Sequence, residues 1–242
     1  RSTLERSREQ LIHAEKLASV GKLAASVAHE IRNPLTSIKM WLFWIRSAIS
    51  AAPDINDAFD VVAGELSRLE SVVRNFLDFS RPPELKLQPH DVEELLDKSL
   101  ELLGHRIIER QVHLSRQPSP GLPLVMADAD QIKQVLINLF DNAVESLDRG
   151  GEIRISSDRT LDNGTEVVVV RVADSGRGIP PDVTGRIFEP FFTTKEQGTG
   201  LGLCIAASIM ARHGGRLLLE STSPEGTCFE VYIPVAKVEP HE

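Results

Sequence analysis

The sequence predicts a protein of two parts, a helical hairpin followed by an α/β sandwich. Over the first eighty or so residues, apolar residues recur at alternating three- and four-residue steps, the spacing of a helix–helix seam. Beyond the double proline Pro82-Pro83, helical patterns alternate with short β-branched runs. A single hairpin with one apolar stripe buries little surface. We therefore expect two copies to pair as a four-helix bundle in a homodimer.

The composition narrows the class of protein. The chain has 242 residues, 41% of them hydrophobic and 26% charged, which is typical of soluble globular proteins. A net charge of −8 and the lack of a large basic patch argue against a nucleic-acid partner. The most apolar run, Ile38 to Ile45, contains Lys39 and is too short to cross a bilayer, so we expect no direct membrane contact.

The two cysteines and the N-terminus bear on localisation. Two cysteines give neither a disulfide framework nor a metal-ligand spacing, and they fit a reducing compartment. The chain starts at Arg1 without a methionine or a visible signal peptide. We expect it to be the cytoplasmic part of a longer protein, which is either membrane-anchored or soluble.

Two long helices account for the first part. The first pattern runs from about Leu4 to Ser50, with seam residues Leu17, Val20, Ala24, Val27, Ile31, Ile38 and Ile45. The run from Ser50 to Asp54 ends it, and Asp54 or Asn56 can cap the second helix. The second seam comprises Phe59, Val62, Leu66, Leu69, Val73 and Phe76, and this helix ends at Ser80-Arg81-Pro82-Pro83.

A histidine on the first helix stands out from this packing pattern. With Ile31 at an a position, His29 falls at f and faces water, and Asn33 lies four residues on along the same face. Pro34 lacks the N–H that would bond the carbonyl of Glu30, so the helix should be kinked or strained beside His29. An exposed histidine with a carboxylate neighbour at such a point indicates a reaction site.

The second part follows a short linker from Pro82 to Pro89. We expect helices over Asp91–Glu109, Asp128–Leu147 and Leu201–His213, and strands over Val112–Leu114, Glu152–Ser156, Glu166–Val172, Arg216–Ser221 and Thr227–Pro234. Asn163-Gly164 predicts a hairpin turn, and Gly214-Gly215 ends the third helix. Helices with a mostly antiparallel sheet predict an α/β sandwich.

An amide stripe follows one face of the second of these helices. Gln134, Asn138 and Asn142 lie at i, i+4 and i+8, opposite the apolar residues Leu136, Leu139 and Ala143. Buried amides need partners, and amide oxygens suit a hard cation such as Mg²⁺. A solvated helix face is the alternative interpretation.

Two glycine-rich segments complete the chemical pattern. A valine-rich strand ends at Asp174, whose carboxylate can accept from an exocyclic amine, while Gly176 and Gly178 let the backbone approach a flat ring. An ordinary tight turn also explains that pattern. The run Gly198–Leu203 opens a helix, where backbone N–H groups form an anion site suited to nucleotide phosphates. It is neither a Walker loop nor a Rossmann fingerprint.

Three phenylalanines lie between the two glycine segments, at positions 188, 191 and 192. The segment has no periodicity. Its phenylalanines either anchor a mobile lid or tuck under the core.

These blocks, in this order, resemble those of the sensor histidine kinases of two-component signalling. His29–Leu35 resembles the H-box of that family, Gln134–Ala143 the N-box, Asp174–Pro180 the first glycine box, Phe188–Phe192 the phenylalanine box and Gly198–Leu203 the second glycine box. The resemblance extends from about Glu15 to Pro234. It implies that the second part has the ATP-binding fold of the gyrase, chaperone and histidine-kinase type.

The resemblance implies a reaction on the first helix. His29 would be the phosphoacceptor, with Glu30 orienting the ring or taking its proton. The implied function is ATP-dependent autophosphorylation of His29 and transfer of the phosphoryl group to an aspartate of a response regulator. Asn33 matches the residue that positions water for phosphatase activity on the phosphorylated regulator.

The resemblance also implies a nucleotide site. Asn142 would bind Mg²⁺ with Asn138 beside it, and Asp174 would read the adenine amine. Lys195 would contact the phosphates and Thr227 the base side of the pocket. The remaining nucleotide-binding residues implied are Gly176, Gly178, Gly198, Thr199, Gly200, Leu201 and Gly202, of which Gly198, Gly200 and Gly202 would bend the lid around the phosphates.

The expected domain organisation follows these motifs. We expect a signal-transmitting helix over residues 1–14, a dimerisation and histidine phosphotransfer domain over 15–82, a linker over 83–89, a catalytic ATP-binding domain over 90–238 and a tail over 239–242. Trp41, Phe43 and Trp44 are bulkier than the family's usual aliphatic residues, so the bundle is expected to pack differently there. Glu145-Ser146 after the N-box resembles the nitrogen-regulation branch.

Two other functions share parts of this pattern. Gyrase-like, chaperone-like and mismatch-repair ATPases resemble the C-terminal half, but they would release free phosphate. A catalytically silent dimeric scaffold would bind nucleotide only to relay conformation. The other histidines have no comparable context and are interpreted as surface or packing residues: His13, His90, His105, His113, His213 and His241.

Overall fold

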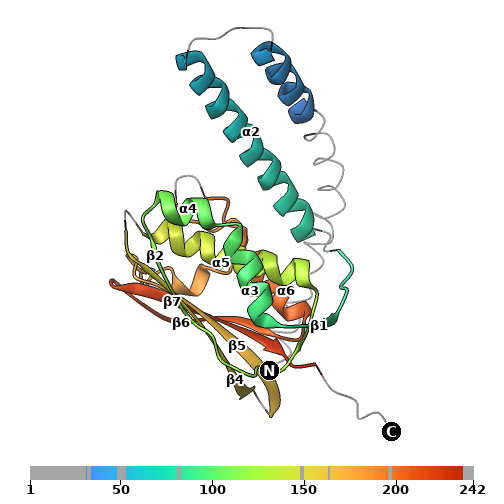
Figure 1. Cartoon of the computed structure of the whole chain (residues 1–242), viewed down its shortest axis with the longest axis vertical. Coiled ribbons are helices and arrows are strands. Elements are labelled where there is room, and N and C mark those ends of the chain that lie inside the picture. Colours follow the sequence, from blue (N-terminus) through green and yellow to red (C-terminus); the bar gives the residue numbers. More distant parts are fainter. Residues whose placement is uncertain are drawn as a thin grey trace, which may run out of the picture. The chain divides into compact units, whose positions relative to one another are not determined.

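The computed structural model describes residues 31, 34–47, 53–80, 83–147, 150–162, 164–195 and 198–236. The chain divides into two compact units, Arg1–Pro83 and Glu84–Glu242 (Figure 1). The boundary between the two units falls directly after the double proline. Each unit is described by itself.

The first unit contains a helical hairpin. A helix over residues 34–47 is followed by α2 (Pro53–Ser80), and Leu35 and Leu66 are buried. Ion pairs join the two helices, with Lys39 Nζ 2.6 Å from Glu70 Oε2 and Arg46 paired with Asp60. All four side chains are solvent-accessible, so each pair contributes at most about 1 kcal/mol and the apolar contacts dominate.

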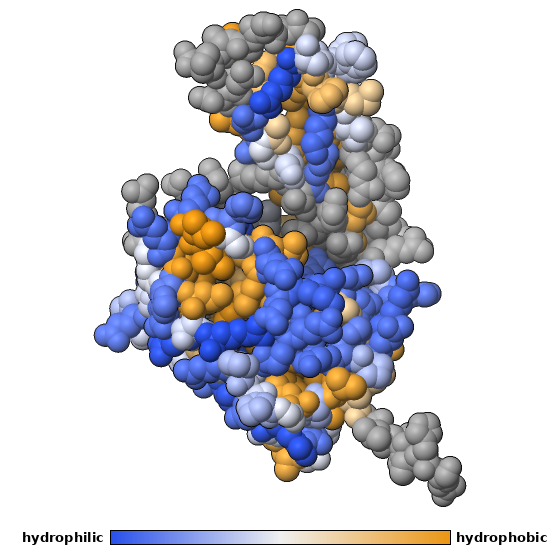
Figure 2. Space-filling view, viewed as in Figure 1, coloured by the Kyte–Doolittle hydropathy of each residue, from blue (hydrophilic) through white to orange (hydrophobic). Residues whose placement is uncertain are grey.

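Much of the predicted seam remains exposed in the single chain. Ile38, Val62 and Leu69 are 45%, 43% and 44% exposed, and Figure 2 shows apolar surface among charged side chains on this unit. Trp41 and Phe43 are more exposed still, at 68% and 71%. An exposed stripe at seam positions is what the homodimer prediction requires, and the dimer remains a prediction.

The start of α2 differs from the expected one. The helix begins at Pro53, ahead of Asp54 and Asn56, so the prediction that one of these two residues caps it was wrong. Proline suits the first helical position because its fixed φ matches the helix and its missing N–H would have no partner there.

The second unit is a sandwich of a five-stranded sheet and one layer of helices, with a separate two-stranded sheet (Figure 1). The five-stranded sheet has the order β2-β4-β5-β7-β6, with β2 parallel to β4 and the other neighbours antiparallel. Its strands are β2 (His113–Gln117), β4 (Glu152–Asp162), β5 (Thr165–Asp174), β6 (Arg216–Ser223) and β7 (Gly226–Pro234). The helices are α3 (Val92–Glu101), α4 (Gly104–Glu109), α5 (Ala129–Ser146) and α6 (Gly202–Arg212), and a short 3₁₀ turn, η1, spans Thr184–Arg186.

The core lies between α5 and the centre of the sheet. α5 buries Ile132, Val135, Leu136 and Leu139, and it contacts β5, whose residues 167–170 are four buried valines. α3 and α6 flank α5. Each Å² of apolar surface buried here contributes roughly 25 cal/mol to stability. This packing holds α5 against the sheet and so fixes the direction of its polar face.

Several elements differ from the expected ones, and β2 and β4 extend beyond their predicted ends, to Gln117 and Asp162. A two-stranded antiparallel sheet pairs β1 (Gln88–His90) with β3 (Val125–Ala127), and neither strand was predicted. Three residues carry too little periodicity to predict a strand. The end of the predicted linker therefore belongs to the second unit, where the Lys86 N–H also donates to Asp128 Oδ2 at 3.0 Å.

The single helix expected over Asp91–Glu109 is two helices, so that prediction was wrong. α3 ends at Glu101 and α4 begins at Gly104. Glycine disfavours a helix interior, which favours a break at this point. The described helices include none that is both long and apolar enough to span a membrane.

Candidate nucleotide-binding site

His29, Glu30 and Asn33 lie outside the described residues, so their predicted roles remain predictions. The predicted residues of the second unit are all described. They come from the polar face of α5, the end of β5, the start of β7 and the segment that leads into α6.

The amide stripe of α5 reaches the second glycine segment. Asn138 Nδ2 donates to the carbonyl of Gly202, the first residue of α6, at 3.1 Å. Asn142 lies one turn farther along the same face and is half-buried. The stripe is therefore not a solvated helix face, because Asn138 ties α5 to the second glycine segment.

Lys195 lies against Asn142. Its ammonium Nζ is 3.0 Å from Asn142 Oδ1 and 2.6 Å from Glu145 Oε2. Arg106 pairs with Asp141 and lies 3.6 Å from Glu145 Oε1, so two cations face the acidic side chains of α5. A positive group thus already occupies the amide oxygen that was predicted to hold a cation.

Asp174 ends β5 with its carboxyl group half-buried. Its Oδ1 accepts from the Gly176 N–H and from the Ser146 hydroxyl, each at 2.8 Å. Burial raises the pKa of Asp174, while these two hydrogen bonds, the Thr227 N–H and the charge of Lys195 act against that rise.

Close packing explains the glycines of the first loop. A Cβ on Gly176 would lie 2.2 Å from Ser146 Oγ, and one on Gly178 would lie 1.8 Å from the carbonyl oxygen of Ser223. Gly226 has the same constraint against the Asp174 carbonyl, at 2.0 Å. This loop is therefore more than an ordinary tight turn, since side chain or backbone from another element closes on each of its two glycines.

Thr227 lies next to Asp174, on the neighbouring strand β7. The two residues are paired across β5 and β7, and Thr227 is buried. Its Oγ1 is 3.4 Å from Thr222 Oγ1, which accepts from the Ile179 N–H at 2.8 Å. The first glycine loop is thus fastened to the β6–β7 hairpin.

The phenylalanine segment is joined to the second glycine segment. The Phe191 N–H donates to the Gly200 carbonyl at 3.0 Å, and both residues have positive φ, 64° and 67°. A Cβ on Gly200 would lie 2.4 Å from the Phe191 carbonyl carbon, and one on Gly198 would lie 2.3 Å from Thr193 Oγ1. Thr199 Oγ1 accepts from the N–H of buried Leu201 at 3.4 Å.

The three phenylalanines divide between the two interpretations. Phe188 packs edge-on against Phe229, with ring centroids 6.5 Å apart, and so is tucked under the core. Phe192 lies beneath the Arg186 guanidinium, 4.4 Å from its carbon. Phe191 is 59% exposed, as a lid residue would be.

Comparison with known families accounts for both units. The "His Kinase A (phospho-acceptor) domain" matches residues 19–84. The "Histidine kinase-, DNA gyrase B-, and HSP90-like ATPase" family matches residues 127–237. The chain belongs to the sensor histidine kinases. The resemblance drawn from the five sequence blocks is thereby confirmed.

Individual histidine kinases match over nearly the whole chain. Sensor histidine kinase ZraS of Salmonella typhimurium is 37% identical over 96% of this chain and 50% of its own length. Sporulation kinase E of Bacillus subtilis is 34% identical over 94% of this chain and 30% of its own length. The chain thus spans half or less of these two curated relatives.

Solved histidine kinases share the fold. Full-length ShkA in complex with AMPPNP superposes with a TM-score of 0.76 at 29% identity, over 90% of this chain and 47% of that one. ThkA in complex with the response regulator protein TrrA gives a TM-score of 0.67 at 33% identity, over 97% of this chain and 67% of that one.

Two residues that contact the predicted site residues were not themselves predicted to take part. Ser146 contacts Asp174, and Glu145 holds Lys195. Ser146 could have been found, because it extends the series Gln134, Asn138 and Asn142 by one further turn of α5.

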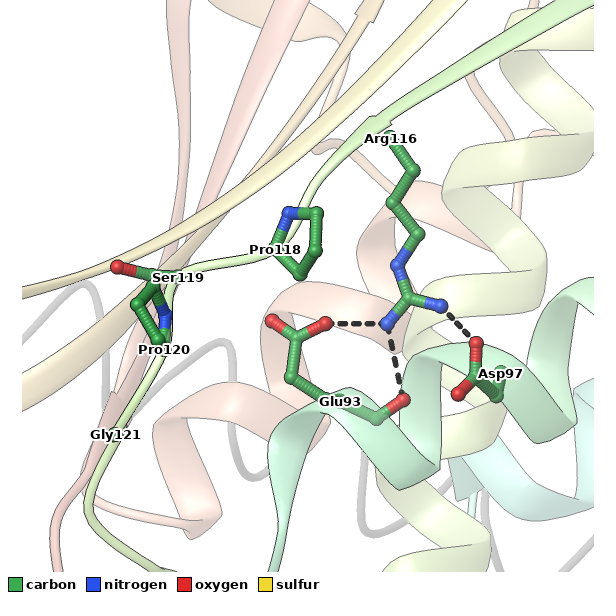
Figure 3. Close-up of a pocket in the computed structure, with 7 residues that line it drawn as sticks. All are labelled: Glu93, Asp97, Arg116, Pro118, Ser119, Pro120 and Gly121. Atoms are coloured by element: carbon green, nitrogen blue, oxygen red, sulfur yellow. Dashed lines mark hydrogen bonds and ion pairs between the residues drawn. The ribbon is translucent and has the colours of Figure 1, made fainter.

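A separate pocket of the kinase lies between α3 and the end of β2 (Figure 3). Arg116 points into it from β2, where it pairs with Glu93 and Asp97 and donates to the Glu93 carbonyl at 3.1 Å. The predicted nucleotide-binding residues are not among those that line it. The charges of this pocket are paired with one another, and they tie α3 to the sheet.

Proposed function

We propose that this chain transfers the γ-phosphoryl group of ATP to its own His29 and then to an aspartate of a response-regulator receiver domain. The observation that carries the proposal is that one face of α5 contacts the second glycine segment through Asn138, Lys195 through Asn142 and Asp174 through Ser146, within a chain that also matches the phospho-acceptor domain.

Each residue has a defined task. The Asp174 carboxylate accepts from the exocyclic amine of adenine, and Thr227 borders the base. The N–H groups at the start of α6 face the phosphates, as anions favour a helix N-terminus. Asn142 would hold Mg²⁺ through its amide oxygen Oδ1, and the metal would neutralise phosphate charge. In the structure the same Oδ1 accepts a hydrogen bond from the Lys195 ammonium.

The phosphoryl group is transferred twice, first from ATP to His29 and then from His29 to the receiver. A neutral imidazole nitrogen of His29 attacks the γ-phosphorus, the bond to the β–γ bridging oxygen breaks, and ADP leaves. Glu30 orients the ring and takes its other proton as positive charge develops. The phosphoryl group then passes from nitrogen to a carboxylate oxygen of the receiver.

The remaining parts of the proposal concern assembly and reversal. The exposed seams of the hairpin support a homodimer formed through residues 15–82. Asn33 is proposed to position water for hydrolysis of the phosphorylated regulator. We assign the catalytic unit to residues 90–238 and place this chain in the cytoplasm.

Incubation with radiolabelled ATP tests the proposal. We expect an acid-labile, base-stable phosphoryl adduct on the wild-type chain, and no adduct on His29→Gln although it still binds ATP. An adduct of that kind on His29→Gln would overturn the assignment. Free phosphate released without any adduct would instead favour a gyrase-like ATPase, and ATP binding with neither product a silent scaffold.

A further inference from the structure

Ser146, the last residue of α5, faces the carboxylate that is proposed to read the nucleobase. Its Oγ is 2.8 Å from Asp174 Oδ1 and 2.7 Å from the Ala143 carbonyl oxygen. The Ala143 carbonyl belongs to the last turn of α5. Two acceptors therefore compete for one hydroxyl proton.

The charge of Asp174 decides that competition. A hydroxyl carries a single proton, so it donates to one acceptor at a time. Hydrogen bonds to an ionised acceptor are roughly twice as strong as neutral ones. When Asp174 is ionised the proton points to its Oδ1, because the reverse orientation would set oxygen lone pairs against each other at 2.8 Å.

The Asp174 carboxylate has hydrogen-bond acceptor positions that the protein does not use and that a ligand can reach. An ionised carboxylate has about four acceptor positions. The Gly176 N–H and the Ser146 hydroxyl use two of them, both on Oδ1. The positions left over accept hydrogen bonds, which an exocyclic amine can donate and a carbonyl oxygen cannot.

Ser146 also opposes protonation of this carboxyl group. Burial raises the pKa of Asp174, and the Ser146 hydrogen bond is the largest influence that lowers it. Lys195 is the charged group that adds to this lowering. A protonated Asp174 would gain an O–H donor and could then bond a carbonyl on the base.

We propose that Ser146 is a positioning residue that selects the nucleobase. Its hydroxyl holds Asp174 as an acceptor, so the site takes a purine with an exocyclic amine at position six and rejects one with a carbonyl there. This inference rests on the proposed function, in which Asp174 binds adenine.

The tight packing around Ser146 limits the useful variants. Even a methyl group on Gly176 would lie 2.2 Å from Ser146 Oγ, so a branched or longer side chain at position 146 would not fit. Ser146→Ala removes the donor without adding volume. Ser146→Cys keeps a group of similar size that donates weakly.

Ser99→Ala is a matched control. Ser99 is buried on α3, and its hydroxyl donates to the Leu95 carbonyl at 2.7 Å, four residues earlier. Both alanine variants lose a hydroxyl bonded within a helix, but Ser146→Ala alone loses a bond to a carboxylate.

Calorimetric binding of ATP and of inosine triphosphate to the 242-residue chain tests the proposal. Inosine triphosphate carries a carbonyl in place of the amine. We expect Ser146→Ala to weaken ATP binding about tenfold, the usual scale for a lost hydrogen bond to a charged group. The preference for ATP over inosine triphosphate falls by a similar factor, and Ser99→Ala retains both.

The pH dependence of ATP binding is a second measurement. If Ser146 served only to pack the helix, Ser146→Ala would not change the pH at which ATP binding is lost. ATP binding needs ionised Asp174, so it is lost as pH falls through the pKa of that carboxyl. Removal of the Ser146 donor raises that pKa, so the loss begins at higher pH in Ser146→Ala. Ser146→Cys is expected between the two.

The outcomes separate this inference from the proposed function. A wild-type chain that shows no preference for ATP over inosine triphosphate overturns this inference and the assignment of Asp174 to the base, whereas the phosphoryl adduct on His29 tests the proposed function independently. A wild-type preference that survives in folded Ser146→Ala, with an unchanged pH profile, overturns the role of Ser146 alone. If Ser146→Ala melts below the assay temperature, the same comparison with Ser146→Cys decides.

Discussion

At the scale of single residues, His213 shows how a buried polar group is satisfied. Its Nε2 accepts from the Asp128 N–H at 3.0 Å, and its Nδ1 lies 2.8 Å from the Ile209 carbonyl oxygen. A neutral ring with its proton on Nδ1 fits both partners. The interpretation of His213 as a packing residue is confirmed, and it joins the end of α6 to the start of α5.

This arrangement makes stability depend on pH. Burial lowers the pKa of His213, whereas in the unfolded chain a histidine takes up a proton below about pH 6.5. Just below that pH the unfolded state binds more protons, so the free energy of unfolding falls as pH drops. The stability that neutral His213 contributes is thus fully present above about pH 6.5 and is lost below it.

Urea titrations of wild type and His213→Gln between about pH 5.5 and about pH 7.5 check this prediction. The wild-type advantage should be largest at the upper end and shrink toward the lower. His105→Gln, at an exposed histidine, is the control and should give no such trend. A constant wild-type advantage across the range would contradict the prediction.

At the scale of elements, the second glycine segment depends on one backbone conformation. Gly200 has a φ of 67°, and a Cβ there would lie 2.4 Å from the Phe191 carbonyl carbon. An alanine would be strained by about 1–3 kcal/mol and would also push the phenylalanine segment away. The N–H groups at the start of α6 would then be displaced.

We therefore expect Gly200→Ala to weaken ATP binding about tenfold or more while the chain remains folded. Gly185→Ala is the matched control, because a Cβ at Gly185 in η1 meets no atom within 4 Å. Equal ATP affinity for the two variants in a fluorescence titration would show that this strain does not matter for binding.

The elements also show how far sequence reasoning reaches. α5 was predicted almost to the residue, because it has a long apolar period and Asp128 caps it by accepting from the N–H groups of Asp130 and Gln131. β1 and β3 were missed because three residues show no period, and the break between α3 and α4 interrupts an otherwise continuous pattern.

The predicted site residues, like the helices, were found where the local sequence carries a pattern. Asn138, Asn142 and Asp174 are revealed by local motifs and their order along the chain. The same series extended by one turn points to Ser146, but not to its partner. The contacts of Ser146 with Asp174 and of Lys195 with Glu145 join residues 28 and 50 positions apart, and no local pattern encodes such pairs.

At the scale of the whole molecule, the exposed seam of the hairpin predicts how two copies pair. Val62 lies on the seam and is 43% exposed, whereas its neighbour Val61 lies off the seam and is 72% exposed. A second copy would cover the first residue and leave the second in water.

Glutamate variants at these two neighbouring positions test the dimer through its dissociation constant. Val62→Glu would bury a charge in the bundle and should raise the dimer dissociation constant at least about a hundredfold. Val61→Glu should leave it unchanged. Sedimentation equilibrium measures both constants, and equal effects of the two variants would argue against a dimer formed through this seam.

The position of Lys195 has a consequence for the order of events in the proposed cycle. Its ammonium lies on Asn142 Oδ1, and a divalent cation on that oxygen would be repelled by the ammonium. If Asn142 binds Mg²⁺, the metal would displace the ammonium from Asn142 and leave Glu145 as the partner of Lys195 on α5. Metal affinity and the contact between Lys195 and Asn142 would then be reciprocally linked: whatever strengthens that contact must weaken metal binding by the same factor.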